Sequence, residues 1–238
     1  MGMKNFTAQQ SLDCDGSNAC QGLAFAGNDL TCLNGACTDM DVVLPGKALV
    51  CTSGACQNMR ATGVTSLSCP GPNGGSCAGM TLTGGTTLDC GESNTGCKGA
   101  TFRCAKDEDC SVTCHGREVD TCVDLVVDGE AARSLSVEFA IAGGQIMTDS
   151  RQRYWGAHIG TAGAKGAAIR CPGTESGGPC SIKCVGSENS GAPGRFGHMY
   201  QRTGVPSQLC HSMTVNASRS GPAPVVFVAC IGRGSSPE

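Results

Sequence analysis

The chain has 238 residues, a formal net charge of −3, 36 glycines and 19 cysteines, and only 4% of its residues are aromatic. It contains no run of 18 apolar residues, so no segment is predicted to span a membrane as a helix. Its basic residues are spaced singly and form no stripe, which argues against nucleic acid as a partner.

The most regular feature of the chain is a repeat of about 18 to 21 residues. Each copy starts with hydrophobic-x-Cys, passes through a short gap to a second Cys, and then alternates apolar with polar residues. The first halves are Leu12-Asp13-Cys14, Leu30-Thr31-Cys32, Leu49-Val50-Cys51, Leu67-Ser68-Cys69, Leu88-Asp89-Cys90 and Val112-Thr113-Cys114. The second halves begin at Cys20, Cys37, Cys56, Cys77, Cys97 and Cys122. A fixed period of this size indicates a stack of similar units.

Three and five places after each second Cys the residue is apolar. These residues are Leu23, Phe25, Met40, Val42, Met59, Ala61, Met80, Leu82, Ala100, Phe102, Leu125 and Val127. The residues between them are mostly polar or small, so each second half is predicted to be a strand with one buried face. One copy cannot bury its apolar row alone, and stacked copies would form a continuous narrow core.

The sequence therefore predicts an all-β fold, a disulfide-stapled parallel β-helix or β-solenoid. The abundant glycine and the lack of a 3.6-residue period argue against a helical repeat. We expect one elongated domain over residues 1–238, with regular repeats at 10–130 and irregular, inserted repeats at 131–238. The pattern resembles that of cysteine-rich parallel β-helix proteins.

The cysteines are predicted to pair locally, because each pair brackets one corner of a repeat, although sequence alone cannot fix the connectivity. The predicted disulfides are Cys14–Cys20, Cys32–Cys37, Cys51–Cys56, Cys69–Cys77, Cys90–Cys97, Cys104–Cys110, Cys114–Cys122, Cys171–Cys180 and Cys184–Cys210. Cys230 is left unpaired, either buried at the end of the solenoid or bonded to another chain. Each small loop closed in this way would stabilise the fold by about 2–3 kcal/mol.

The repeat is harder to follow in four places. Leu135-Ser136-Val137 looks like a first half with Val in place of Cys, and Ile169-Arg170-Cys171 looks like a restored first half. Cys104 and Cys110 fit no corner and are expected to close a small excursion. Ile182-Lys183-Cys184 begins a further first half, and its second half is expected 26 residues later at Cys210.

Metal binding is the alternative use of so many cysteines. Zinc sites favour CxxC-type spacing with histidines in register, whereas here the gaps are five to nine residues and the four histidines do not repeat. We therefore expect no metal and no other cofactor. Disulfides indicate an oxidising compartment, either extracellular or the lumen of an organelle, the thylakoid lumen included.

Three interruptions of the repeat, at 103–111, about 138–168 and 185–209, are candidate binding loops, since insertions in solenoids often lie on the binding face. The candidate interface residues are Arg151, Arg153, Tyr154, Trp155, Arg195, Phe196, Tyr200 and Arg202. Aromatic residues and arginine are enriched in interface hot spots, but the same aromatics could cap the open end of the solenoid. Charge is also uneven: residues 1–150 carry a net −9 and residues 151–238 a net +6.

An enzyme of the β-helix type would need clustered carboxylates. The candidates Asp39, Asp41 and Asp124 do not fall on adjacent repeats, although a pair such as Glu118 with Asp120 could form in an insertion. Short cysteine-stapled solenoids also resemble ice-binding proteins. An ice-binding face would need Thr at many equivalent outward positions, which here hold Ala24, Asp41, Arg60, Thr81, Thr101 and Val126.

The function expected from the sequence is that of a non-catalytic structural or interaction protein of an oxidising compartment. It would serve as an accessory subunit that docks a protein partner, for example in a lumenal part of a membrane assembly such as a photosystem supercomplex. The alternative is a carbohydrate-binding or carbohydrate-cleaving β-helix protein at the cell surface. Ice binding is a lesser alternative.

Overall fold

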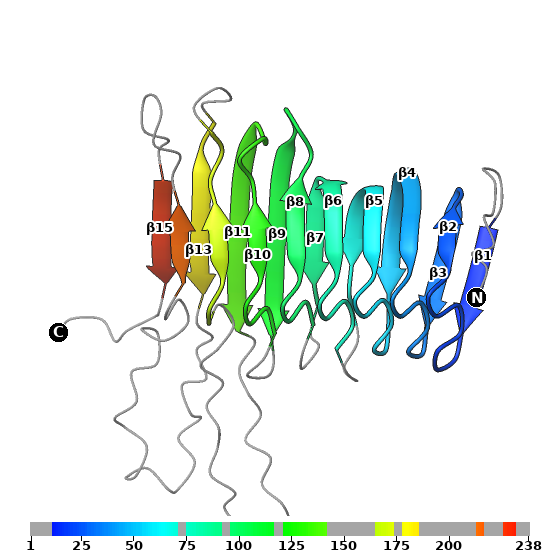
Figure 1. Ribbon diagram of the computed structural model, residues 1–238. Coiled ribbons are helices and arrows are strands. Elements are labelled where there is room, and N and C mark those ends of the chain that lie inside the picture. The colour runs from blue at the N-terminus through cyan, green and yellow to red at the C-terminus, as the bar shows by residue number, and fades with distance from the viewer. Residues whose placement is uncertain are drawn as a thin grey trace, which may run out of the picture.

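The structure, a computed structural model, describes residues 11–70, 75–91, 96–116, 121–141, 165–173, 178–185, 213–216 and 226–231. In these ranges the chain contains strands and no helix, and all of its strand pairs are parallel. The strands stack side by side from β1 at one end to β15 at the other (Figure 1). The predicted β-solenoid fold is confirmed.

Fifteen strands are described, and they belong to one continuous sheet. In chain order they are β1 (Ser11–Asp15), β2 (Ala24–Ala26), β3 (Asp29–Leu33), β4 (Asp41–Cys51), β5 (Arg60–Ser68), β6 (Thr81–Gly85), β7 (Thr87–Cys90), β8 (Thr101–Cys104), β9 (Asp109–Gly116), β10 (Val126–Asp128), β11 (Ser134–Ile141), β12 (Ala168–Arg170), β13 (Cys180–Val185), β14 (Thr214–Asn216) and β15 (Val226–Ile231).

The sheet is folded into two faces. Face 1 consists of β1, β3, the second parts of β4 and β5, and then β7, β9, β11, β13 and β15. Face 2 consists of β2, the first parts of β4 and β5, and then β6, β8, β10, β12 and β14. We call the connection from face 1 to face 2 the disulfide corner, and the connection back to face 1 of the next repeat the return corner.

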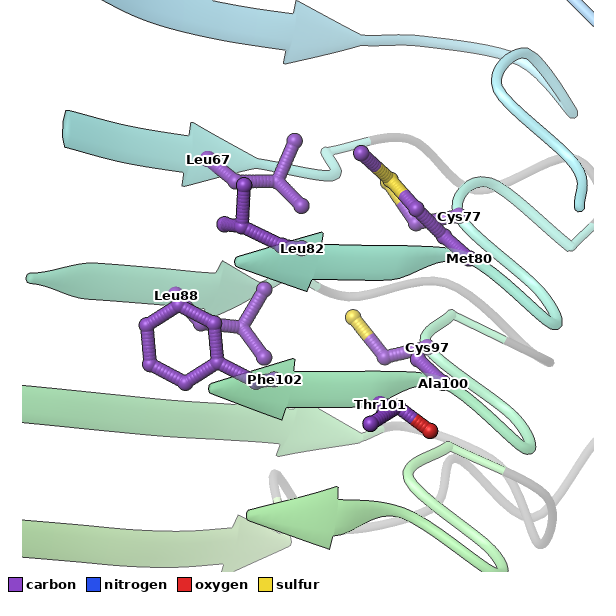
Figure 2. Close-up of a pocket in the computed structure, with 9 residues that line it drawn as sticks. All are labelled: Leu67, Cys77, Met80, Leu82, Leu88, Cys97, Ala100, Thr101 and Phe102. Carbon is purple, nitrogen blue, oxygen red and sulfur yellow. The ribbon is translucent and has the colours of Figure 1, made fainter. Parts of the chain in front are cut away.

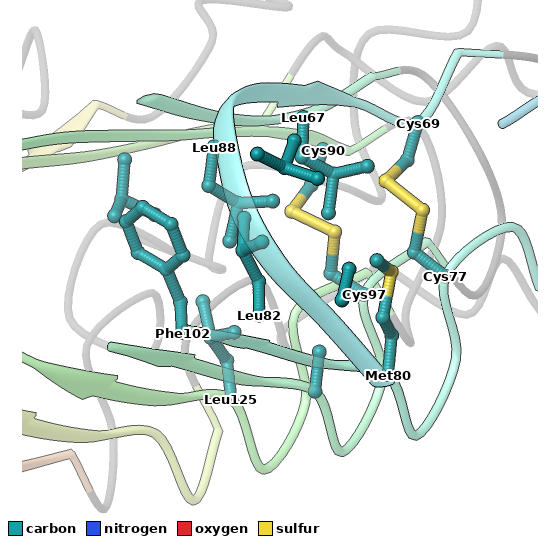
Figure 3. Packing of buried hydrophobic residues seen from close by; sticks show 14 of the residues in the cluster. Leu67, Cys69, Cys77, Met80, Leu82, Leu88, Cys90, Cys97, Phe102 and Leu125 are labelled. Carbon is teal, nitrogen blue, oxygen red and sulfur yellow. A yellow bond between two sulfur atoms is a disulfide. The ribbon is translucent and has the colours of Figure 1, made fainter. Parts of the chain in front are cut away.

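The core lies between the two faces. Eleven of the twelve apolar residues expected there are buried, and the twelfth, Leu23, is partly buried at the first repeat. Figure 3 shows Leu67 and Leu88 from face 1 packed toward Leu82 and Phe102 from face 2. Neighbouring repeats contribute side chains in register, for example Leu82 opposite Phe102. Burying each such side chain stabilises the fold by about 1.5–3 kcal/mol.

The predicted register of the repeat at Leu135-Ser136-Val137 is wrong by two residues. Val137 pairs with Val112, and Phe139 pairs with Cys114, so Phe139 occupies the position of the first Cys. A shift of two residues leaves the same side chains on the buried face, so alternation alone cannot detect it. Pairing with the neighbouring strand β9 decides the register.

Ile169-Arg170-Cys171 is also assigned differently by the structure. It was expected to be a first half, but Ile169 lies in β12 on face 2, opposite Val127 of β10. The other late strands follow the expected pattern. On face 1 Cys184 lies opposite Phe139 and Cys230 opposite Cys184, and on face 2 Val215 lies opposite Ile169.

Candidate interaction surfaces

The disulfide corner carries six of the predicted disulfides, one in each regular repeat. They are Cys14–Cys20, Cys32–Cys37, Cys51–Cys56, Cys69–Cys77, Cys90–Cys97 and Cys114–Cys122. Because the first cysteines of neighbouring repeats are in register, the disulfides stack in a column, and Figure 3 shows two of them side by side. This edge of the solenoid is therefore covalently closed in each regular repeat.

The second cysteine of each of these six pairs has a left-handed backbone conformation, with φ between 54° and 62°. Few residues other than glycine adopt this conformation, since the Cβ atom is placed close to the backbone. The disulfide and the backbone hydrogen bonds to the neighbouring repeat, such as Cys56 N–H to Ala36 C=O at 3.0 Å, hold the cysteine there. The corner is thus built around a strained cysteine.

The residue two places after the second cysteine is left-handed as well. This position holds Gly22, Asp39, Asn58, Gly79, Gly99 and Asp124, all with positive φ. Glycine, asparagine and aspartate are the residues that tolerate this conformation best, which explains the composition of the row. A Cβ atom on Gly79 would lie 2.4 Å from Oδ1 of Asn58, so a larger residue at position 79 would require the Asn58 side chain to move. Asp39 and Asp124 are therefore turn-forming residues of the corner.

The return corner carries two further disulfides, Cys104–Cys110 and Cys171–Cys180. The expectation that Cys104 and Cys110 fit no corner is wrong, because they link the end of β8 to the start of β9 across this corner. Cys110 and Cys180 are each opposite Leu135 of the repeat between them. The predicted interruption at 103–111 is accordingly a short corner of residues 105–108, and β8 and β9 continue up to it.

The last predicted pair is not tested. Cys184 is disulfide-bonded, but Cys210 and the side chain of Cys230 lie outside the residues that the structure describes. The pairing of Cys184 with Cys210 and the unpaired state of Cys230 thus stay predictions. In the backbone register Cys230 is the direct neighbour of Cys184.

All eight candidate interface residues, in segments 151–155 and 195–202, lie outside the described residues, as do Glu118 and Asp120. The strands that anchor the two segments are described. The first segment follows β11 and precedes β12, and the second follows β13 and precedes β14. Since β11 pairs with β13 and β12 with β14, both insertions start and end on neighbouring strands of the same corner.

A well-formed ion pair lies at the return corner. Arg133 donates from Nε to Oδ1 of Asp109 at 2.9 Å, and Ser134 Oγ donates to the same oxygen at 2.7 Å. These hydrogen bonds lower the pKa of Asp109 from 3.8 to about 2, with the Arg133 bond as the largest cause. A general acid needs a raised pKa, whereas the pKa of Asp109 is lowered. This carboxylate is therefore suited to a structural role at the return corner.

The outward residues of face 2 form two rows. One row runs Ala24, Asp41, Arg60, Thr81, Thr101, Val126, Ala168 and Thr214, and the other runs Ala26, Val43, Thr62, Thr83, Arg103, Asp128, Arg170 and Asn216. Exposed ion pairs join neighbours in these rows, Arg60 to Asp41 at 4.0 Å and Arg170 to Asp128 at 3.7 Å. The Arg60–Asp41 pair is the more exposed of the two, and exposed pairs add little stability.

The interior offers little room for a ligand in the described part of the chain. A cavity of about 10 Å³ lies in the core, and Figure 2 shows the residues that line it, among them Leu88, Ala100 and Phe102. Its lining is almost entirely apolar, and an apolar void of this size binds no polar molecule. The sulfur atoms of Cys90, Cys114 and Cys122 lie within 4.8 Å of one another, but all three belong to disulfides and offer no thiolate to a metal.

The described residues thus define a disulfide-rich parallel β-solenoid, and their disulfides are consistent with an oxidising or extracellular environment. None of them belongs to a helix long and apolar enough to cross a membrane. No protein-family model, no curated protein and no solved structure matches the chain.

Proposed function

We propose that this chain is a non-catalytic structural and interaction protein of an oxidising compartment. In this role the solenoid is a rigid support, and segments 142–164 and 186–212 dock a partner protein. The observation that carries the proposal is the anchoring of both segments on neighbouring strands, β11 with β13 and β12 with β14, at one corner. The two segments that dock the partner would therefore be anchored at the same edge of the rod.

The stapled corners support the role of a rigid support. Eight disulfides close loops of five to nine residues along the described part of the solenoid. A support that keeps its shape lowers the entropy lost when a partner binds. An accessory subunit in the lumenal or extracellular part of a larger assembly is the form of the proposal that uses this property best.

The composition of the inserted segments supports docking. They carry Trp155 and Tyr200 together with arginines, the residue types that contribute most to binding hot spots. Residues 151–238, which include most of both segments, have a net charge of +6, whereas residues 1–150 have −9. A partner with an acidic surface would be steered toward this part of the chain.

The test is native purification from the source organism, followed by mass spectrometry of the chains that migrate with the protein. We expect a partner in constant stoichiometry, and we expect the variant Trp155→Ala/Tyr200→Ala to lose it while its thermal unfolding midpoint stays unchanged. Met147→Ala/Met199→Ala, with substitutions in the same segments, is the matched control and should keep the partner. A wild-type protein that migrates alone as a monomer contradicts the proposal, and a variant that loses its fold assigns the aromatics to a cap.

A further inference from the structure

A polar patch on face 2 has no role in the proposed docking. It spans three consecutive strands, β5, β6 and β8, whose register places Arg60, Thr81 and Thr101 in one row. The second row of the same three strands holds Thr62, Thr83 and Arg103. The residues between the rows, Ala61, Leu82 and Phe102, are buried in the core, so all six patch residues face outward.

The geometry of the patch follows from the strands. Neighbouring strands lie about 4.8 Å apart, and two residues along a strand span about 6.6 Å. Four threonines therefore form a regular group, and the two arginines stand at its opposite corners, with roughly 12 Å between their Cα atoms. A polymer lying flat across the three strands would meet hydroxyl groups in the middle and a guanidinium group near each end.

The polar groups of the patch are available. Within the described residues, the hydroxyls of Thr62, Thr81, Thr83 and Thr101 have no hydrogen-bond partner in the protein. No described residue forms an ion pair with Arg103. The neighbour of Arg103 in its row, Asp128, is engaged by Arg170 at 3.7 Å. The side chain of Arg60 is 78% exposed, and its guanidinium group comes no closer to the Asp41 carboxylate than 4.0 Å. Water therefore weakens this ion pair.

We infer that this patch binds an extended anionic polysaccharide, one that carries a sulfate or a carboxylate on its repeating unit. Arginine forms paired, charge-assisted hydrogen bonds with such oxyanions, and the threonine hydroxyls can both donate to and accept from sugar hydroxyls. The separation of the arginines fits anions on different sugar units better than a single small anion. Polysaccharides of this kind belong to the extracellular side, which agrees with the disulfides.

The experiment measures binding of the full-length oxidised protein to dextran sulfate, with uncharged dextran as the reference polymer. We expect binding to dextran sulfate alone, weakened by added salt. Arg60→Gln/Arg103→Gln should reduce the affinity by about tenfold or more, since each arginine supplies a charge-assisted hydrogen bond. Thr81→Val/Thr101→Val keeps the branched shape, removes two hydroxyls, and should reduce the affinity by roughly threefold or more.

The matched control is Arg133→Gln/Lys183→Gln, which removes the same charge from the return corner and from face 1. It should change the affinity by less than about twofold if the patch is a site. Equal losses in the two charge variants would show attraction by overall charge and would overturn the inference. Equal binding of dextran and dextran sulfate, or no binding of either, would overturn it as well. The thermal unfolding midpoint, measured for every variant, identifies any that has lost its fold, and the threonine variant then decides.

Discussion

The two corners of the solenoid solve the same problem in different ways. At the disulfide corner each regular repeat has a disulfide, and the second cysteine is held in a left-handed conformation. At the return corner tight turns use glycines with positive φ, such as Gly46 and Gly63, and a disulfide occurs where the chain needs a longer connection, as at Cys104–Cys110. A disulfide therefore accompanies an irregular or strained turn, and glycine suffices where the turn is tight.

Among the described repeats, each corner also has one that lies between two disulfide-bonded repeats and has an apolar side chain in place of a cysteine. At the disulfide corner Phe139 takes the place of the first Cys, between Cys114 and Cys184. At the return corner Leu135 lies between Cys110 and Cys180. Both residues are almost fully buried, so the side chain fills the space that sulfur atoms fill elsewhere. Substitutions at these positions test whether packing and cross-linking are interchangeable.

The largest effect is expected for Phe139→Ala. The side chain is fully buried, and no disulfide joins its repeat at this position, so truncation leaves a cavity that the neighbours cannot close. The free energy of unfolding should fall by about 3–5 kcal/mol, as measured by guanidinium denaturation of the oxidised protein. A loss below about 1 kcal/mol would show that the stacked repeats on both sides hold the corner without it.

Leu135→Ala should have the next largest effect. It removes a buried leucine between two disulfides, and we expect a loss of about 2–4 kcal/mol. The same denaturation measurement applies. Ser136→Ala, an exposed position in the same strand, is the control and should leave stability unchanged. If the leucine variant is as stable as the control, the two neighbouring disulfides are sufficient at the return corner.

Removing one disulfide from each corner compares the corners directly. The loops closed by Cys90–Cys97 and Cys104–Cys110 are similar in length, so each removal should cost about 2 kcal/mol in chain entropy. All four cysteines are buried, so the cavity left by alanine should add about 1 kcal/mol at either corner, and the two double alanine variants should lose similar amounts of stability. A clearly larger loss for Cys90→Ala/Cys97→Ala would show that the disulfide column contributes more than its cross-links.

The left-handed cysteine gives a smaller and sharper test. In a Cys90→Ala background, Cys97→Gly should be more stable than Cys97→Ala by about 1 kcal/mol, because the backbone at residue 97 has a φ of 54°. The difference between two thermal unfolding midpoints measures it. At the return corner, where Cys110 has no such φ, the same exchange should favour alanine.

The smallest effect concerns pH. Because the pKa of Asp109 is about 2 in the folded chain and 3.8 without its partners, its ion pair with Arg133 stabilises the fold above about pH 4. This contribution is lost as the pH falls from about 4 to about 2. Thermal unfolding of Asp109→Asn should therefore depend less on pH in this window than unfolding of the wild type. Identical pH profiles would show that solvent screens the pair completely.

Much of the fold could be predicted because the repeat is local. Hydrophobic-x-Cys and the apolar offsets after the second Cys, as in Met80 and Leu82, determine which side of each strand is buried, since side chains alternate along a strand. A corner between two cysteines that are five to nine residues apart brings them close together, so their pairing could be predicted. The candidate interface residues, in contrast, lie in segments without the repeat, where no periodic pattern indicates a position.

What the tertiary structure alone decided is how the repeats align. The positions of Phe139 in the cysteine column, of Ile169 on face 2 and of Cys104–Cys110 at the return corner follow from pairing with neighbouring strands. A shift by two residues preserves the buried face, so the amino-acid sequence is compatible with more than one register until hydrogen bonds to the next repeat select one. The sequence by itself determined the solenoid and its local cross-links, because both depend on residues close together in the chain. For the polar patch, the repeat in the sequence placed Arg60, Thr81 and Thr101 at equivalent outward positions, and only the strand register placed Thr62, Thr83 and Arg103 in a second row beside them.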